Sequence, residues 1–138
     1  SDPSILRNYE LLNSIKGIGT INAMNTIIHT NNFQAFETAR QYACYLGIAP
    51  FEHSSGTSIK GKTRVYPTGA KLLKADLSQA ANSAIVWDKE MKEYYERKRK
   101  EGKAYGVVLN AVKFKLVGRM FAVVKRGTPF VELMTYKK

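Results

Sequence analysis

The sequence has a single cysteine, few acidic residues and no long hydrophobic run, and each shortage excludes a class of protein. Cys44 has no partner within the chain, so no internal disulfide can form, and no Cys/His cluster has the spacing of a zinc site. No apolar stretch approaches the ~20 residues that a membrane-spanning helix needs. We therefore expect a cytoplasmic protein that works in a reducing compartment and has no membrane partner.

The fold class follows from length and from helical spacing of apolar residues. A chain of 138 residues with 44% hydrophobic content suits a single domain, residues 1–138, with one core. We expect a mainly α fold with an irregular loop over residues 48–68, a possible site for a short β-hairpin near residues 57–66. Thr128 and Pro129 favour a last short turn or helix. The periodicity predicts helices over residues 4–15, 20–28, 36–46, 69–87, 89–100 and 104–125.

Positive charge is abundant and unevenly placed. The chain carries 22 basic and 11 acidic residues, a net charge of +11. Residues 1–59 have a net charge of −1 and residues 60–138 of +12. A surface this positive suits phosphates, because nucleic-acid binding releases condensed counterions. Nucleic acid is the first expected partner, ahead of anionic lipid, since no helix combines a basic face with a broad apolar one.

An apolar-x-Gly-apolar-Gly pattern in residues 15–19 separates the first two expected helices. It is typical of a helix-hairpin-helix, in which glycines let the main chain approach a phosphate and helix-start amides bind it. Thr20 is placed to cap the second helix. The alternative is a glycine turn that only packs two helices together. The nucleic-acid contacts predicted here are Gly17, Gly19, Thr20 and Ile21.

The loop over residues 48–68 is the best candidate for a catalytic site, because loops of this length in compact domains are usually functional or disordered. Ser54 and Ser55 precede Gly56, and five cations follow without an acidic residue between them. A serine that attacks a phosphodiester needs fixed cations near the phosphorus, and an arginine fork grips phosphate oxygens best. The tripeptide by itself is ordinary turn chemistry and rarely indicates a nucleophile, and His53 is more often a surface residue than a base. The cations are Lys60, Lys62, Arg64, Lys71 and Lys74.

Several ordered motifs together resemble one family over most of the chain. They include residues 15–23, Phe36 through Pro50, Ser54–Gly56, the basic stretch to Gly69, and Gly102-Lys103 followed by Ala111-Val112. The chain resembles the C-terminal domain of the bacterial insertion-sequence transposases that group with the pilin-gene-inverting recombinase and are known for bridge-RNA guides. Two positions depart from the family pattern: Pro67 stands in place of a lysine, and Lys74 in place of an arginine.

The resemblance implies an activity that the residues alone do not establish. Family members join an N-terminal RuvC-like domain, whose acidic residues bind magnesium, to a domain with a serine nucleophile. The family serine falls on Ser55, with Ser54 as the alternative, and the RuvC-like domain lies outside this chain. The implied function is DNA binding and strand transfer in the nucleoid, with a guide RNA and a homo-oligomer as further partners. We expect no metal in the chain itself, since its carboxylates are sparse. No exposed apolar stripe in the sequence indicates where a homo-oligomer would form its interface.

The main alternative is a module without catalysis, a helix-hairpin-helix that tethers a partner to DNA or structured RNA. A basic protein associated with the ribosome would instead prefer RNA and need neither serine.

Overall fold

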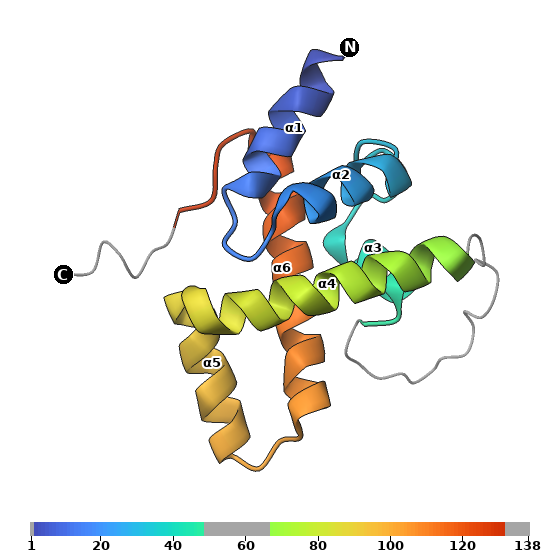
Figure 1. Ribbon diagram of the computed structural model, residues 1–138. Helices are drawn as coiled ribbons and strands as arrows, with labels where there is room; N and C mark the ends of the chain where they lie inside the picture. The colour runs from blue at the N-terminus through green and yellow to red at the C-terminus, as the bar shows by residue number, and fades with distance from the viewer. Residues whose placement is uncertain (1, 49–66, 132–138) are drawn as a thin grey trace.

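The computed structural model describes residues 2–48 and 67–131, and only the backbone of residues 67–69. Over these ranges the secondary structure is helical throughout, with no strand, which confirms the mainly α prediction (Figure 1). The expected β-hairpin near residues 57–66 lies outside the described residues. The helices are α1 (Pro3–Asn13), α2 (Thr20–His29), α3 (Ala39–Leu46), α4 (Pro67–Trp87), α5 (Lys89–Lys100) and α6 (Tyr105–Arg126).

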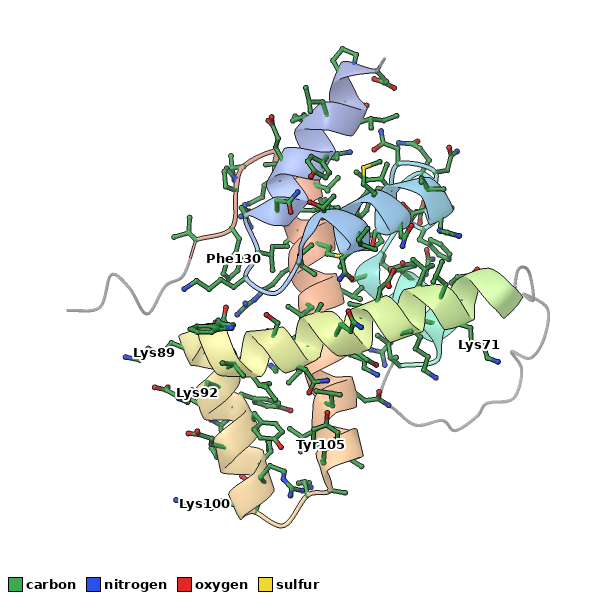
Figure 2. All side chains as sticks on the ribbon, viewed as in Figure 1. Lys71, Lys89, Lys92, Lys100, Tyr105 and Phe130 are labelled. Carbon is green, nitrogen blue, oxygen red and sulfur yellow. The ribbon has the colours of Figure 1, made fainter. Side chains whose placement is uncertain are left out.

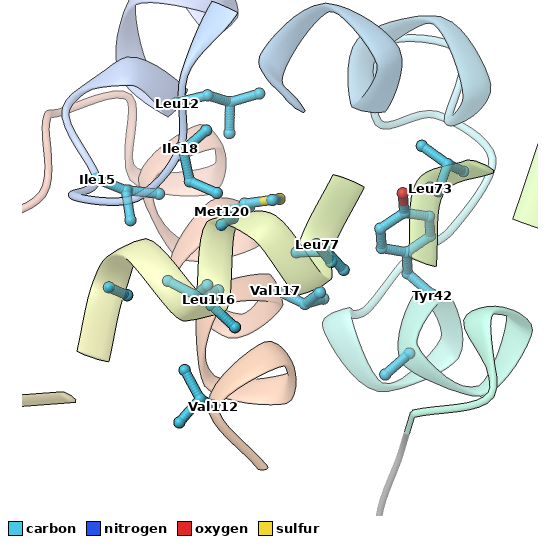
Figure 3. Close-up of a cluster of buried hydrophobic side chains, with 14 of the residues drawn as sticks. Leu12, Ile15, Ile18, Tyr42, Leu73, Leu77, Val112, Leu116, Val117 and Met120 are labelled. Atoms are coloured by element: carbon cyan, nitrogen blue, oxygen red, sulfur yellow. The ribbon is translucent and has the colours of Figure 1, made fainter. Parts of the chain in front are cut away.

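Helix α6 is the central element of the fold. It packs against α1, α3, α4 and α5, and α4 lies across it (Figure 1). One side of α6 is fully covered over three turns, because apolar residues recur there at helical spacing. Figure 3 shows these side chains meeting Leu12, Ile15 and Ile18 on one side and Leu73, Leu77 and Tyr42 on the other. The buried α6 residues at the centre of this core are Val112, Leu116, Val117 and Met120.

The helix ends agree with the sequence signals at most positions. Asp88 caps α5 by accepting a hydrogen bond from the Met91 amide at 2.9 Å, and Gly47 and Gly127 take the left-handed conformation that ends α3 and α6. Two boundaries were predicted wrongly. Gly19 rather than Thr20 is the N-cap of α2, and α3 begins at Ala39 rather than near residue 36 because the Thr38 side chain caps it.

Some residues predicted to be buried are exposed. Leu72 is 48% exposed and Val107 is 60% exposed, although both fit the apolar stripes of α4 and α6. Val107 lies in the part of α6 that projects with α5 as a two-helix hairpin below α4 (Figure 1). Of the last short turn or helix expected from Thr128 and Pro129, no helix forms as far as Val131, the last described residue.

A buried carboxylate links α5 to α6. The Asp88 side chain is 1% exposed, and its Oδ2 accepts a hydrogen bond from Arg119 Nη1 at 2.8 Å. Arg119 Nη2 also binds Glu90 Oε1 at 2.7 Å, and the guanidinium lies over the Phe130 ring, 4.2 Å from its centroid. These contacts hold the start of α5 and the segment that follows α6 against the middle of α6, so Arg119 has a structural role.

Arg119→Ala should lower the free energy of unfolding by about 3 kcal/mol, because it leaves the Asp88 carboxylate buried without its counter-charge. Urea denaturation followed by circular dichroism measures this change. The matched control is Lys98→Ala, which removes an exposed Lys98–Glu101 pair of 3.3 Å and should cost less than about 1 kcal/mol. Equal losses in the two variants would contradict the structural role of the Arg119–Asp88 pair.

Candidate nucleic-acid interface

The α1–α2 turn over residues 14–19 has two glycines with different surroundings. Ile15 and Ile18 anchor the turn, since they are 1% and 5% exposed in the core. Gly17 has a φ of +99°, and a Cβ added there would lie 2.7 Å from the carbonyl oxygen of Ala80 and 3.2 Å from the Ala84 Cβ. The space beside Gly17 is therefore occupied by α4. The structure gives Gly17 a packing role, and its contact with DNA stays a prediction.

Gly19 is open to solvent. Among the residues that the structure describes, no atom outside Gly19 and its two chain neighbours lies within 4 Å of the position that a Cβ would take on Gly19, and α2 has no side-chain cap at its start. The first backbone bond of α2 runs from the Ala23 amide to the Gly19 carbonyl, so the amides of Thr20 and Ile21 precede the helical ladder. Amides at a helix start can donate hydrogen bonds to a bound anion such as a phosphate. The Thr20 hydroxyl is 3.1 Å from the Tyr9 hydroxyl and contributes to the α1–α2 contact.

The exposed face of α2 is apolar. Ile21, Met24 and Ile28, at helical spacing, are 63%, 41% and 62% exposed. The expectation that no exposed apolar stripe would be found is therefore wrong. The helix buries Ala23 and Ile27 on its other face, so α2 is apolar on two sides. Exposed apolar surface of this kind typically marks an interaction site. Helix α2 itself contains no lysine or arginine.

The lysines predicted on α4 occupy two positions. Lys71 is exposed near the start of α4, and Figure 2 shows its side chain directed away from the core. Lys74, one turn later, brings its Nζ atom to 3.8 Å from the Cβ position of Gly47 at the end of α3. The structure thus joins Lys74 to the end of α3. The remaining predicted site residues, Ser54, Ser55, Lys60, Lys62 and Arg64, lie outside the described residues.

Sequence reasoning missed Lys113, which lies in the middle of α6. This lysine is 7% exposed and belongs to the buried set of α6. Burial lowers the pKa of Lys113, and the positive charge of Lys74 lowers it further. Lys74 lies on α4 and Lys113 on α6, two helices that pack against each other. The signal in the sequence was a charged residue at an apolar position of the α6 stripe.

The basic run on α5 has the solvated character expected of it. Lys98 pairs with Glu101 at 3.3 Å, and Arg97 and Lys98 both lie over the Tyr94 ring. Lys115 of α6 approaches the same ring to 4.5 Å. Figure 2 shows further α5 lysines, Lys89, Lys92 and Lys100, directed away from α6. These cations extend the positive surface along the outer side of the α5–α6 hairpin.

Over residues 2–48 and 67–131, no group of three or more His, Cys, Asp or Glu residues could hold a metal ion. Tyr42 is buried against α2, and burial raises the pKa of its hydroxyl well above the usual range, so it stays neutral. None of the helices over residues 2–48 and 67–131 is both long and apolar enough to cross a bilayer.

Comparison with known proteins identifies the family. The sequence profile of the Transposase IS116/IS110/IS902 family matches residues 9–96. The chain belongs to this transposase family. The matched region contains the α1–α2 turn, both candidate serines and the lysines of α4, whereas Lys113 lies beyond it.

Two kinds of relative are similar to the chain. It is 30% identical over 118 residues to "Insertion element IS110 uncharacterized 43.6 kDa protein" of Streptomyces coelicolor, covering 86% of this chain and 29% of that protein. It is also 26% identical over 130 residues to the "Pilin gene-inverting protein" of Moraxella bovis and of Moraxella lacunata, covering 93% of this chain and 40% of each relative. The transposase chain therefore spans well under half the length of these relatives.

Proposed function

We propose that this chain is the DNA-binding and strand-transfer part of a transposase or site-specific recombinase, with Ser55 as the nucleophile and Ser54 as the alternative. The observation that carries the proposal is the family match over residues 9–96, which includes both serines and the cations that follow them. The net charge of +12 over residues 60–138 supports a polyanionic substrate. The gene-inverting activity named for the Moraxella relatives supports DNA as that substrate.

The proposed chemistry is a nucleophilic displacement at phosphorus. The Ser55 hydroxyl passes its proton to a carboxylate, which we assign to the RuvC-like domain, as its oxygen bonds to the scissile phosphorus, and the bond from phosphorus to the leaving deoxyribose oxygen breaks. Arg64, Lys60 and Lys62 stabilise the negative charge that develops on the phosphoryl oxygens, with Lys71 and Lys74 extending the positive surface. The leaving oxygen takes up a proton, which we assign to a carboxylic acid of the RuvC-like domain.

Other partners belong to the complete protein. We propose that magnesium binds the RuvC-like carboxylates. A guide RNA follows from the family resemblance, and a homo-oligomer follows because recombination needs two or more active sites near each other. The exposed apolar face of α2 is a suitable surface for such an assembly. This chain without its RuvC-like partner should bind DNA weakly and catalyse nothing.

The test is to trap the covalent bond between serine and DNA. A suicide duplex that loses its leaving strand after cleavage is incubated with a protein that joins this chain to the RuvC-like domain. Mass spectrometry of the digested adduct should locate the phosphodiester on Ser55. Efficient recombination with no serine adduct would refute the proposed nucleophile.

The open start of α2 favours a second candidate function, a module that binds the DNA backbone without catalysis. The amides that precede the α2 ladder and the exposed Gly19 are arranged as a helix start that could receive a phosphate. In this alternative both serines are dispensable for every activity of the protein. The packing of Gly17 on α4 is compatible with both functions, because it fixes the turn and leaves Gly19 exposed.

Gly19→Asp should separate phosphate binding at this turn from simple helix packing. An aspartate N-cap accepts hydrogen bonds from the α2 amides and stabilises the helix by a few tenths of a kcal/mol to about 1 kcal/mol. The same carboxylate should weaken binding to a fluorescent DNA duplex several-fold, because it occupies and repels the phosphate site. Fluorescence anisotropy and thermal denaturation measure the two effects. Unchanged DNA affinity in the stabilised variant would show that the turn only packs helices.

A further inference from the structure

The most exposed large apolar side chain in the described part of the chain is a tryptophan. Trp87, the last residue of α4, is 71% exposed, and its neighbour Val86 is 55% exposed. Over residues 2–48 and 67–131, no hydrogen bond, ring contact or cation–π contact joins the indole to another residue. A tryptophan usually contributes its large apolar area to a core or to an interface. The core does not use Trp87, so an interface is the remaining use for its ring.

The backbone around Trp87 is held in place by the corner between α4 and α5. Only Asp88 separates the two helices, and its amide donates to the Ala84 carbonyl at 2.8 Å. The Asp88 carboxylate is buried, caps α5 and accepts a hydrogen bond from Arg119 of α6. The indole is therefore presented from a fixed backbone, and little chain freedom is lost when a flat partner stacks on it.

The face of α4 that includes Trp87 also receives the α1–α2 turn. A Cβ on Gly17 would lie 2.7 Å from the Ala80 carbonyl oxygen and 3.2 Å from the Ala84 Cβ. Ala80, Ala84 and Trp87 fall on one side of a helix with about 3.6 residues per turn, and Trp87 is about 4.5 Å further along the axis than Ala84. Figure 1 shows the α1–α2 turn beside this half of α4. Trp87 therefore comes one helical turn after the contact with the turn that leads to the open start of α2.

Positive charge accompanies the exposed ring. Helix α5 begins two residues after Trp87 and carries six basic and three acidic residues. Lys89 and Lys92 of its first turn are exposed and directed away from α6 (Figure 2), whereas the Glu90 carboxylate is already bound by Arg119 at 2.7 Å. An aromatic ring beside cations matches a nucleotide, which joins a flat base to a phosphate. A protein partner fits less well, because interfaces between proteins are depleted in lysine.

We propose that Trp87 stacks on an unpaired base of the DNA substrate. Bases inside a duplex already stack on both faces, so an indole reaches a base face only where a strand is open or a nucleotide is turned out. Strand transfer separates the strands of a site, so such bases occur during the proposed reaction. Lys89 and Lys92 supply contacts to the backbone phosphates of the same strand. The inference rests on the proposed function, and it adds a contact to a base where the other predicted contacts are to the backbone.

The first test uses the unmodified chain. Trp87 is its single tryptophan, so tryptophan emission reports on this side chain alone. The chain is titrated at low salt with two duplexes of the same sequence, one fully paired and one with a short unpaired stretch in its middle. The open duplex should quench the emission, because a stacked base contacts the indole directly, and the paired duplex should leave most of it. Emission that is unchanged by a saturating amount of the open duplex would overturn the proposal.

The second test measures the affinity of variants for the same duplexes by fluorescence anisotropy. Trp87→Ala should weaken binding of the open duplex about ten-fold and of the paired duplex less than about two-fold. Trp87→Phe keeps an aromatic face and should recover most of the lost affinity. The matched control is Val107→Ala, since Val107 is an apolar residue of α6 that is 60% exposed, and it should change neither affinity by more than about two-fold. Equal losses by Trp87→Ala for both duplexes would refute base stacking.

The remaining readouts separate stacking from folding, from self-association and from DNA binding in general. Trp87→Ala should leave the melting temperature nearly unchanged, because the side chain is mostly exposed, and the emission titration needs no variant if it does not. Emission that changes with protein concentration without DNA would assign the indole to a contact between two copies and overturn the proposal. If the unmodified chain binds neither duplex, the proposed DNA-binding function itself fails. If it binds both equally with unchanged emission, that function stands and the stacking role is refuted.

Discussion

Replacement of Ser55 by alanine should abolish strand exchange by a protein that joins this chain to the RuvC-like domain. Alanine has no oxygen that could bond to phosphorus, so no covalent intermediate forms at residue 55. A neighbouring hydroxyl would have to be repositioned before it could attack the phosphorus in place of Ser55. The side chain is small and neutral, so DNA affinity should stay within about two-fold, because phosphate contacts come mainly from cations. Recombination of a supercoiled plasmid substrate measures the first quantity, and gel shift measures the second.

Ser54→Ala is the matched control, since it removes the same hydroxyl one residue earlier. It should keep a substantial part of the strand-exchange activity and keep the adduct on the suicide duplex. If Ser54→Ala abolishes activity and Ser55→Ala does not, the nucleophile is Ser54. If neither substitution reduces recombination, the chain acts as a DNA-binding module and the reaction takes place elsewhere in the protein.

Local signals account for what the sequence predicted correctly. Asp88, Gly47 and Gly127 mark helix ends because each satisfies helix-end groups within a few residues of itself, so no tertiary contact has to be known. The apolar spacing of α6 likewise predicts burial of Val112, Leu116 and Met120. These features establish a mainly helical domain with α6 in its core. The serines and the cations of residues 60–64 stay predictions because they lie outside the described residues.

The features that the sequence did not predict depend on distant parts of the chain. Phe33 has a φ of +69°, a conformation that is costly for an aromatic residue, and its ring packs edge-on against Phe121 of α6. Lys113 is buried because α3, α4 and α6 converge around it, and the position of Lys74 is known only once α4 is placed. The apolar face of α2 stays exposed because α1 and α4 cover its other side. Periodicity alone does not say which of two apolar faces is covered.

Gly17→Ala should destabilise the domain by roughly 3 kcal/mol, a large share of the ~5–15 kcal/mol that holds a domain folded. Two costs add at this position. A φ of +99° is unfavourable for any residue with a Cβ, by about 1–2 kcal/mol, and the new Cβ would lie 2.7 Å from the Ala80 carbonyl oxygen. The α1–α2 turn would have to move away from α4, exposing part of Ile15 and Ile18. Thermal denaturation should show a fall in melting temperature of roughly 10 °C.

Gly118→Ala is the control for this prediction, because Gly118 lies inside α6 and, over residues 2–48 and 67–131, a Cβ there would meet no atom of another element within 4 Å. It should stabilise the domain by about 0.5–1 kcal/mol, since alanine is the better helix former.

The two glycines of the α1–α2 turn should also differ in their effect on DNA binding. Below its melting temperature, the folded Gly17→Ala protein should lose DNA affinity only to the extent that the displaced turn also moves the start of α2. Gly19→Asp should instead lose DNA affinity while the fold becomes more stable. A Gly17 variant of normal stability that no longer binds DNA would reverse these roles and make Gly17 the phosphate contact.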